Sequence, residues 1–316
     1  MKRALAAIDA FLFAPRDLRV FGAMRIAFAT VVMINALFWA PDLELWFGER
    51  GVLPYAEAVR ATDPGVWTLL GLYPQSDSWL WGCYFVFVAQ IALLGLGLFS
   101  RVQALGVAVW LISFQHRNPN IMDGEDTVFR MLAFLLVLLP IGACYSLDAW
   151  RARVAGRPLP TVGEAWAVRL VQLEMTSIYL STALLKARGD VWTNGTALYY
   201  VSRLDDLWGR FPYPHFLFDS LPLIRAQTWT VLAIEVALPF LLWIPRTRRL
   251  GVVLGVLLHL GIDYLMNLFM FEWVMIVGLM AFTVPADYAA LANGVGWLRR
   301  KLFGAAPVPA ASAQAP

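Results

Sequence analysis

The hydrophobic positions of the chain fall into long apolar runs separated by shorter polar segments. A helix that crosses a bilayer needs about 20 mainly apolar residues, with a tolerated range of about 17–25. Eight runs fit this requirement: about 18–40, 79–99, 102–118, 127–147, 165–187, 228–244, 250–269 and 271–286. The pattern predicts an all-α, polytopic transmembrane helical bundle with about eight spanning helices. The last two runs are nearly continuous, so one broken helix, and seven spans in total, is the alternative.

The runs extend over most of the chain without an internal repeat. We therefore expect a single transmembrane helical domain over residues 1–303, followed by a disordered tail at 304–316 that is rich in Ala, Pro, Ser and Gln. Two long connections, about 41–78 and 188–227, carry Trp, Tyr and Pro. Connections of this length usually have a function or pack against the membrane face.

Composition supports a membrane protein and excludes several other classes. Of the 316 residues, 60% are hydrophobic and only 15% are charged, whereas soluble domains carry roughly 25% charged residues. This excludes a disordered protein, a coiled coil and almost any soluble enzyme of this length. The net charge of +3 comes without a basic stripe, so we expect no nucleic-acid partner. Two cysteines are too few for a disulfide framework or a zinc site. No third residue at a metal-ligand spacing accompanies His259 and Asp263, so we expect no metal.

The basic residues predict an orientation. Lys and Arg gather before the first run and after the second, fourth, sixth and eighth runs. With eight spans, all these positions lie on one side, and an excess of Lys and Arg marks the cytoplasmic side. Both termini are therefore expected to be cytoplasmic. The long connections 41–78 and 188–227 then lie on the outer side.

Ionisable residues inside the apolar runs are costly and are therefore functional candidates by default. They are Arg25, Arg130, Glu174, Glu235, His259, Asp263 and Glu272. The alternative is that they pair with one another and fix the helix packing. His259 and Asp263 are four residues apart and share a helix face. They can form a proton relay, an imidazole oriented by a carboxylate, or a buried structural pair.

Lysine usage singles out one position. The chain has 25 Lys and Arg residues, but Lys186 is the only lysine away from the two ends. Arg is effectively always charged, whereas a desolvated Lys can lose its proton and act as a base. Lys186 is therefore a candidate base, with a snorkelling lysine at a helix end as the alternative. Tyr179 lies seven residues earlier on roughly the same helix face, and Trp192 follows shortly after.

A second polar segment lies on the same predicted side as Lys186, between the third and fourth runs. It runs from His116 to Arg130 and contains the carboxylates of Asp123, Glu125 and Asp126. These carboxylates can hold a substrate ammonium, pair with Arg130 or tune Lys186. A solvated acidic turn is the alternative interpretation.

Together, these segments resemble the horizontally transferred transmembrane domain family, which is related to vitamin K-dependent gamma-glutamyl carboxylase. The resemblance covers roughly residues 18–285. The matching pieces are Gly51-Val-Leu-Pro54, the stretch from Arg117-Asn118 to Arg130, Tyr145-Ser-Leu-Asp148, and Tyr179 through Lys186 to Trp192-Thr-Asn-Gly195.

The resemblance implies a chemistry. In the carboxylase, a lysine deprotonates a reduced vitamin K, reaction with oxygen gives a stronger base, and carbon dioxide adds to a deprotonated protein glutamate. By this resemblance, Lys186 is the catalytic base. We expect Asp126 to act with it as a catalytic residue, and the expected substrate- or cofactor-binding residues are Tyr179, Arg130, Glu125, Trp192 and His116. The implied cofactor is a reduced vitamin K-like quinone, with CO2 and O2 as co-substrates in a carbon–carbon lyase reaction.

The chain also departs from that enzyme. Lys186 is followed by Ala187 where the eukaryotic enzyme has adjacent lysines, and Asp126 falls near the position of its histidine. We expect no counterpart of that enzyme's large extracytoplasmic C-terminal domain. Two hypotheses stay open: a quinol- or lipid-dependent enzyme that modifies a secreted peptide or small substrate, and a non-carboxylating peptide-maturation or lipid-binding factor. Transport is a third class. We expect a prokaryotic plasma (inner) membrane location with an extracytoplasmic active face, and membrane lipids or quinone as partners.

Overall fold

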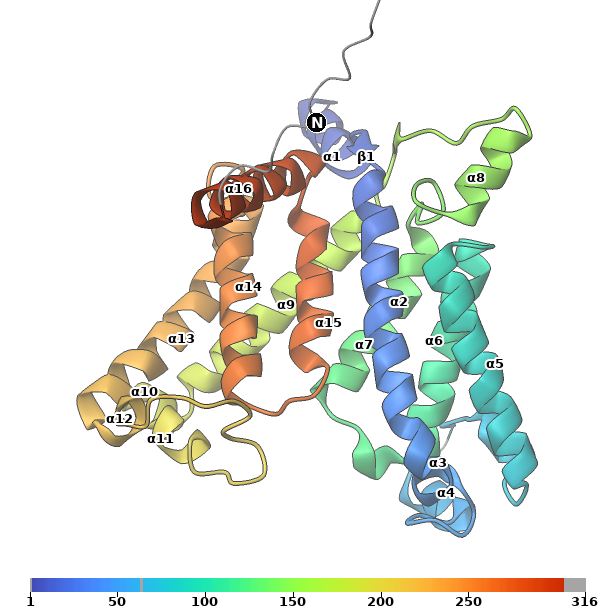
Figure 1. The fold of residues 1–316 in the computed structure, drawn as a ribbon, viewed down its shortest axis with the longest axis horizontal. Helices are drawn as coiled ribbons and strands as arrows, with labels where there is room; N and C mark the ends of the chain where they lie inside the picture. The colour runs from blue at the N-terminus through green and yellow to red at the C-terminus, as the bar shows by residue number, and fades with distance from the viewer. Residues whose placement is uncertain (1, 63–64, 304–316) are drawn as a thin grey trace, which may run out of the picture.

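The computed structural model describes residues 2–62 and 65–303, and this part of the chain is mostly helical (Figure 1). Eight helices run between two ends of a bundle, close to the predicted apolar runs. They are α2 (Arg19–Trp39), α5 (Asp77–Leu96), α6 (Ser100–Arg117), α7 (Gly124–Leu138), α9 (Val168–Ala187), α13 (Leu221–Trp243), α14 (Arg248–Leu265) and α15 (Phe271–Leu279).

Short elements cover both ends of the bundle. The N-terminal end, at the top of Figure 1, carries α1 (Lys2–Phe13), α8 (Leu147–Val154), α16 (Pro285–Phe303), the 3-10 turn η4 (Met280–Phe282), and β1 (Arg16–Asp17) paired antiparallel with β2 (Val162–Gly163). The opposite end holds the two long connections, and we call it the loop end. Its elements are η1 (Ala40–Asp42), α3 (Leu43–Phe47), α4 (Tyr55–Ala61), η2 (Leu69–Leu72), η3 (Pro119–Ile121), α10 (Asp190–Thr193), α11 (Ala197–Val201) and α12 (Phe216–Asp219).

The eight long helices pack as two groups that share one central helix. On one side, α5 contacts α2 and α6, and α6 contacts α7. On the other side, α13 contacts both α9 and α14, and α14 contacts α15. The central α15 also packs against α2, α7 and α9, and Figure 1 shows it beside α2 in the middle of the bundle. Residues at the start of α15 therefore lie close to both groups.

The fourth predicted run, 127–147, is wrong in its extent, because the helix ends at Leu138. Pro140 follows, and proline disfavours a helical conformation at the residue before it. The non-helical segment after it is held by Arg25, a fully buried residue of α2. Its guanidinium donates to the carbonyl oxygens of Ile141 at 2.7 Å and Tyr145 at 2.5 Å, and more weakly to two others. Arg25 thus satisfies carbonyls that lack a helical partner.

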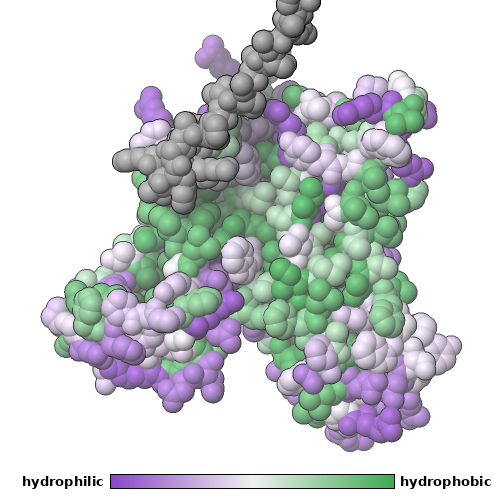
Figure 2. Space-filling model, viewed as in Figure 1, coloured by the Kyte–Doolittle hydropathy of each residue, from purple (hydrophilic) through white to green (hydrophobic). Residues whose placement is uncertain are grey.

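The surface agrees with a membrane protein. On the face shown in Figure 2, apolar residues cover the middle of the molecule and polar residues gather toward both ends. Among the described residues, three helices are long and apolar enough to cross a membrane: Arg19–Phe47, Asp77–Leu96 and Leu221–Trp243. A pair bent by 113°, Phe271–Phe282 with Pro285–Gly294, makes a fourth candidate. Eight spans and cytoplasmic termini stay predictions. The tail predicted at 304–316 lies outside the described residues.

Candidate functional site

Titratable side chains from four helices lie together inside the helix group that contains α9, α13 and α14, toward the loop end. The chain positions that contribute are far apart, so only the packing of α9, α13, α14 and α15 unites them. We call this set the polar cluster; its members are Tyr179, Lys186, Glu235, His259, Asp263 and Glu272.

Lys186 lies in the last turn of α9 and forms an ion pair with Glu235 of α13. Its Nζ donates to Oε1 of Glu235 at 2.5 Å, and 26% of the lysine side chain and 8% of the glutamate side chain are exposed. The ammonium also lies 4.7 Å from the centre of the Trp192 ring, a cation–π contact. The second oxygen of Glu235, Oε2, is buried and has no hydrogen-bond partner among the described residues.

Beside this pair, Tyr179, His259 and Glu272 form a chain of hydrogen bonds. The Tyr179 hydroxyl lies 2.6 Å from Nε2 of His259, and Nδ1 of His259 contacts Oε2 of Glu272. All three residues are at least 97% buried. A neutral imidazole that donates from Nδ1 to the carboxylate can accept from the phenol at Nε2. A phenol, an imidazole and a carboxylate in series can pass a proton in either direction.

The structure separates the two residues that share a face of α14. His259 takes Glu272 as its carboxylate partner, while Asp263 forms an ion pair with Arg210 from the connection after α11. Asp263 therefore does not orient the imidazole, as the four-residue spacing allowed. Glu174, half-buried in α9, has no hydrogen bond or ion pair within the described part of the chain.

The acidic segment around Asp126 serves the start of α7. Asp123 accepts from the backbone N–H of Glu125 at 2.7 Å, and Asp126 accepts from the backbone N–H of Asp123 at 3.0 Å, which together form a capping box. The other oxygen of Asp126 accepts from Nε2 of Gln115 at 2.9 Å. Both oxygens of Asp126 thus have local partners, and no hydrogen bond or ion pair among the described residues joins Asp126 to Lys186.

Two other expected site residues also have local partners. Arg130 donates to the Thr127 hydroxyl at 3.3 Å, one turn earlier on α7. The His116 ring contacts the Trp67 carbonyl oxygen at 2.9 Å, in the connection 41–78. The structure therefore gathers Lys186, Trp192 and Tyr179, and leaves His116 and Arg130 elsewhere at the loop end.

Glu125 links the acidic segment to the polar cluster. It lies before the apolar part of α7, and its Oε2 accepts from the backbone N–H of Met270 at 2.9 Å. Met270 is only two residues from Glu272 of the polar cluster. Burial, reinforced by the charges of Asp123 and Asp126, raises the pKa of Glu125 to about 8.

Within the described part of the chain, no three His, Cys, Asp or Glu residues are arranged to hold a metal ion. Cys83 and Cys144 are both buried and free.

Comparison with known proteins matches the chain to a family model and to curated relatives. A family model described as the HTTM domain matches residues 13–287, most of the chain. The sporulation-delaying protein SdpB of Bacillus subtilis (strain 168) is 25% identical over 210 residues, which are 64% of this chain and 63% of that protein. The chain therefore matches slightly less than two thirds of that relative's length. No solved structure matches.

Proposed function

Because the chain belongs to the HTTM domain family, as the sequence resemblance predicted, we propose that this membrane protein abstracts a proton from a membrane-soluble substrate at the polar cluster. Lys186 is the proposed base. We further propose that the protein lies in a prokaryotic inner membrane with its active face outside the cytoplasm, because the predicted orientation puts the loop end outside.

The Lys186–Glu235 ion pair beside the Tyr179–His259–Glu272 chain is the observation that carries this proposal. Buried ionisable groups in a membrane bundle are expensive and are therefore retained chiefly where they function. Here an ammonium and two carboxylates lie together with a phenol and an imidazole, all partly or fully removed from solvent. Such a set offers acid and base groups of several strengths in one place.

The residues can divide the proton transfer between them. Lys186 must be neutral to act as a base, and its hydrogen bond to Glu235 gives its proton a direct acceptor. The neutral amine then accepts the substrate proton, and the Trp192 ring stabilises the ammonium that forms. His259 can take the Tyr179 proton while Glu272 stabilises the resulting imidazolium.

Two unpartnered oxygens fit a substrate that carries hydroxyl groups. Oε2 of Glu235 and Oε1 of Glu272 are both buried without a hydrogen-bond partner among the described residues. An unpaired buried acceptor costs about 1–3 kcal/mol, so a donor placed there stabilises the site. A reduced vitamin K-like quinone would supply two hydroxyl protons and a pair of electrons, with O2 and CO2 as co-substrates. Glu235, Glu272 and Lys186 are the residues that would hold its hydroxyl groups.

A non-carboxylating role in peptide maturation or lipid binding is the second candidate. The matched relative is named for sporulation delay rather than for a carboxylase, and this supports a non-carboxylating role as the alternative. In that role Lys186 holds an anionic head group and never loses its proton. Lys186→Arg then preserves function, because Arg supplies the same charge.

The test uses the purified full chain in lipid nanodiscs. We first expect a quinone or isoprenoid lipid to co-purify, as identified by mass spectrometry. We then add reduced vitamin K and labelled bicarbonate, and measure quinol consumption and label incorporated into added peptides. We expect Lys186→Ala to abolish quinol consumption, while Arg188→Ala, which removes an exposed cation two residues away, leaves it unchanged. No bound lipid and equal consumption by Lys186→Ala would overturn the proposal.

A further inference from the structure

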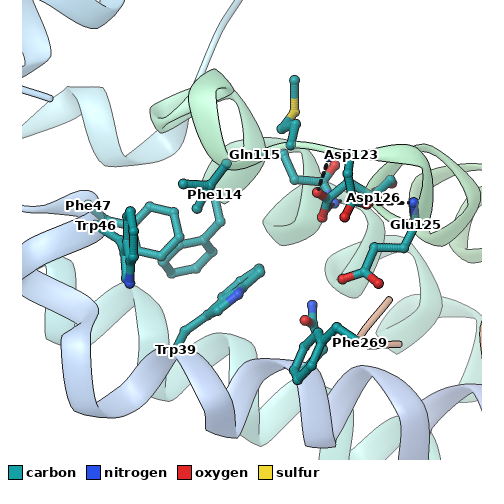
Figure 3. A pocket seen from close by; sticks show the side chains of 12 residues that line it. Trp39, Trp46, Phe47, Phe114, Gln115, Asp123, Glu125, Asp126 and Phe269 are labelled. Atoms are coloured by element: carbon teal, nitrogen blue, oxygen red, sulfur yellow. Dashed lines mark hydrogen bonds between the residues drawn. The ribbon is translucent and has the colours of Figure 1, made fainter. Parts of the chain in front are cut away.

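A second site lies at the loop end, apart from Lys186. A cavity of about 310 Å3 opens between α2, α6, α7 and the segment before α15 (Figure 3), and Lys186 does not line it. Its volume lies at the lower end of the roughly 300–1,000 Å3 typical of small-molecule pockets. Aromatic rings form most of the apolar wall: Trp39, Trp46, Phe47, Phe114 and Phe269.

Two polar side chains in the wall have unused hydrogen-bonding atoms. Asn35 and Gln115 are each 2% exposed, and neither Nδ2 of Asn35 nor Oε1 of Gln115 has a partner among the described residues. The amide nitrogen of Gln115 is already bonded to Asp126, which leaves its oxygen as a free acceptor beside the cavity. Buried atoms of this kind usually have a partner, so their lack of one points to a ligand.

The charge of the wall specifies the kind of ligand. Asp123, Glu125 and Asp126 all line the cavity, whereas its described lining contains no Lys or Arg. Arg130, the basic residue on the same helix, donates to Thr127 instead. Figure 3 shows the Glu125 carboxylate on the side of the cavity that faces Phe269 and Trp39. The wall therefore combines three acidic side chains with aromatic rings, a combination that favours an organic cation. Burial raises the pKa of Glu125 to about 8, and an ammonium beside this carboxyl lowers its pKa again, so the cation and the carboxylate stabilise each other.

We propose that this cavity binds a primary ammonium carried on an apolar or aromatic group, either a small amine or the amino terminus of a peptide. The ammonium donates to the carboxylate of Glu125 and to Oε1 of Gln115, and the apolar part packs on the Trp39 and Phe269 rings. Each of these groups is present in the unliganded wall, so binding requires little rearrangement.

The first experiment compares phenethylamine with 2-phenylethanol, a neutral molecule of nearly the same size and shape. Isothermal titration calorimetry uses the purified full chain in detergent at about pH 9, above the Glu125 pKa of about 8. The amine should bind about tenfold or more tightly, because it adds a charge-assisted hydrogen bond to the ionised carboxylate. Equal affinity for the two molecules would overturn the proposal. A short apolar peptide with a free amino terminus, compared with its acetylated form, distinguishes a peptide ligand from a small amine.

Variants assign the binding to this cavity. Glu125→Gln keeps the shape of the side chain and should weaken phenethylamine binding by about 10- to 100-fold, with little change for 2-phenylethanol. Glu174→Gln removes a half-buried carboxylate elsewhere and should bind like the wild type. If Glu125→Gln does not fold, Trp39→Leu tests the aromatic wall instead and should weaken the binding of phenethylamine. The proposal would be overturned if the folded variant bound phenethylamine as tightly as the wild type.

The proposed base provides an independent check. Lys186→Ala should bind phenethylamine like the wild type, because Lys186 does not line the cavity. This cavity can therefore be confirmed even if the polar cluster proves inactive in quinol turnover. A loss of amine binding in folded Lys186→Ala would overturn the placement of the ligand.

Discussion

Replacing Glu235 by Gln tests whether the ion pair at the polar cluster is energetically real. The amide has nearly the same shape as the carboxylate, but it leaves the Lys186 ammonium without its counter-charge. The pair is short, with 2.5 Å between Nζ and Oε1, and only 8% of the glutamate side chain and 26% of the lysine side chain are exposed. The charge on Lys186 would then be largely buried with one fewer partner.

The magnitude follows from the burial of the two groups. Removing one partner of a fully buried ion pair costs about 3–5 kcal/mol, because an uncompensated charge is left behind. Here the amine is a quarter exposed, keeps the Trp192 ring, and can still donate to the amide oxygen. We therefore expect Glu235→Gln to lower the free energy of unfolding by about 1–3 kcal/mol.

A double-mutant cycle with Lys186→Met provides the assay. The free energy of unfolding is measured by denaturant titration in detergent for the wild type, both single variants and the double variant. The double variant should be more stable than the sum of the single changes predicts, because it leaves no unpaired charge. Glu174→Gln, a half-buried carboxylate without a partner among the described residues, should change stability by less than about 0.5 kcal/mol. Additive effects would refute the ion pair.

Three further outcomes are expected. Arg25→Met should destabilise the protein by about 3–5 kcal/mol in the same titration, because four backbone carbonyls lose a buried charged donor; equal stability would contradict the structural role. Tyr179→Phe should leave folding nearly intact by circular dichroism but slow quinol turnover, because His259 loses its phenol partner; unchanged turnover would remove Tyr179 from the relay. Glu125 holds its proton up to a pKa of about 8 in the folded state and up to roughly 4.3 when unfolded, so stability should fall as pH rises between these values. Glu125→Gln should show a smaller fall in unfolding titrations at pH 5 and pH 8, and an equal fall would contradict the burial of this carboxylate.

The helices and the chemically unusual residues could be predicted from the sequence. The length of an apolar run needed to cross a bilayer, and the cost of placing a charge inside it, can both be read from neighbouring residues. Lys186 stood out by its residue type alone, and the intramembrane Glu235 and His259 by their apolar surroundings. Their pairings could not be predicted. Whether Lys186 meets Glu235, 49 residues later, depends on how α9 and α13 are rotated against each other.

Local signals would have resolved two other positions. The Asp123–Asp126 spacing is that of a capping box, so Asp126 is recognisable as a helix start. Pro140 likewise marks the end of α7 within the predicted run 127–147. The partner of His259 is different in kind, because Glu272 lies across the α14–α15 connection and only the fold brings the two together.

The central claim is that Lys186 exchanges a proton rather than only carrying a charge. Lys186→Arg tests it most directly, because Arg keeps the positive charge beside Glu235 but does not lose its proton. Quinol consumption is measured for the wild type, Lys186→Arg and Arg188→Ala in nanodiscs, after unfolding titrations establish that each is folded. We predict that Lys186→Arg folds but consumes no quinol, while Arg188→Ala matches the wild type. Wild-type consumption by Lys186→Arg would contradict the account.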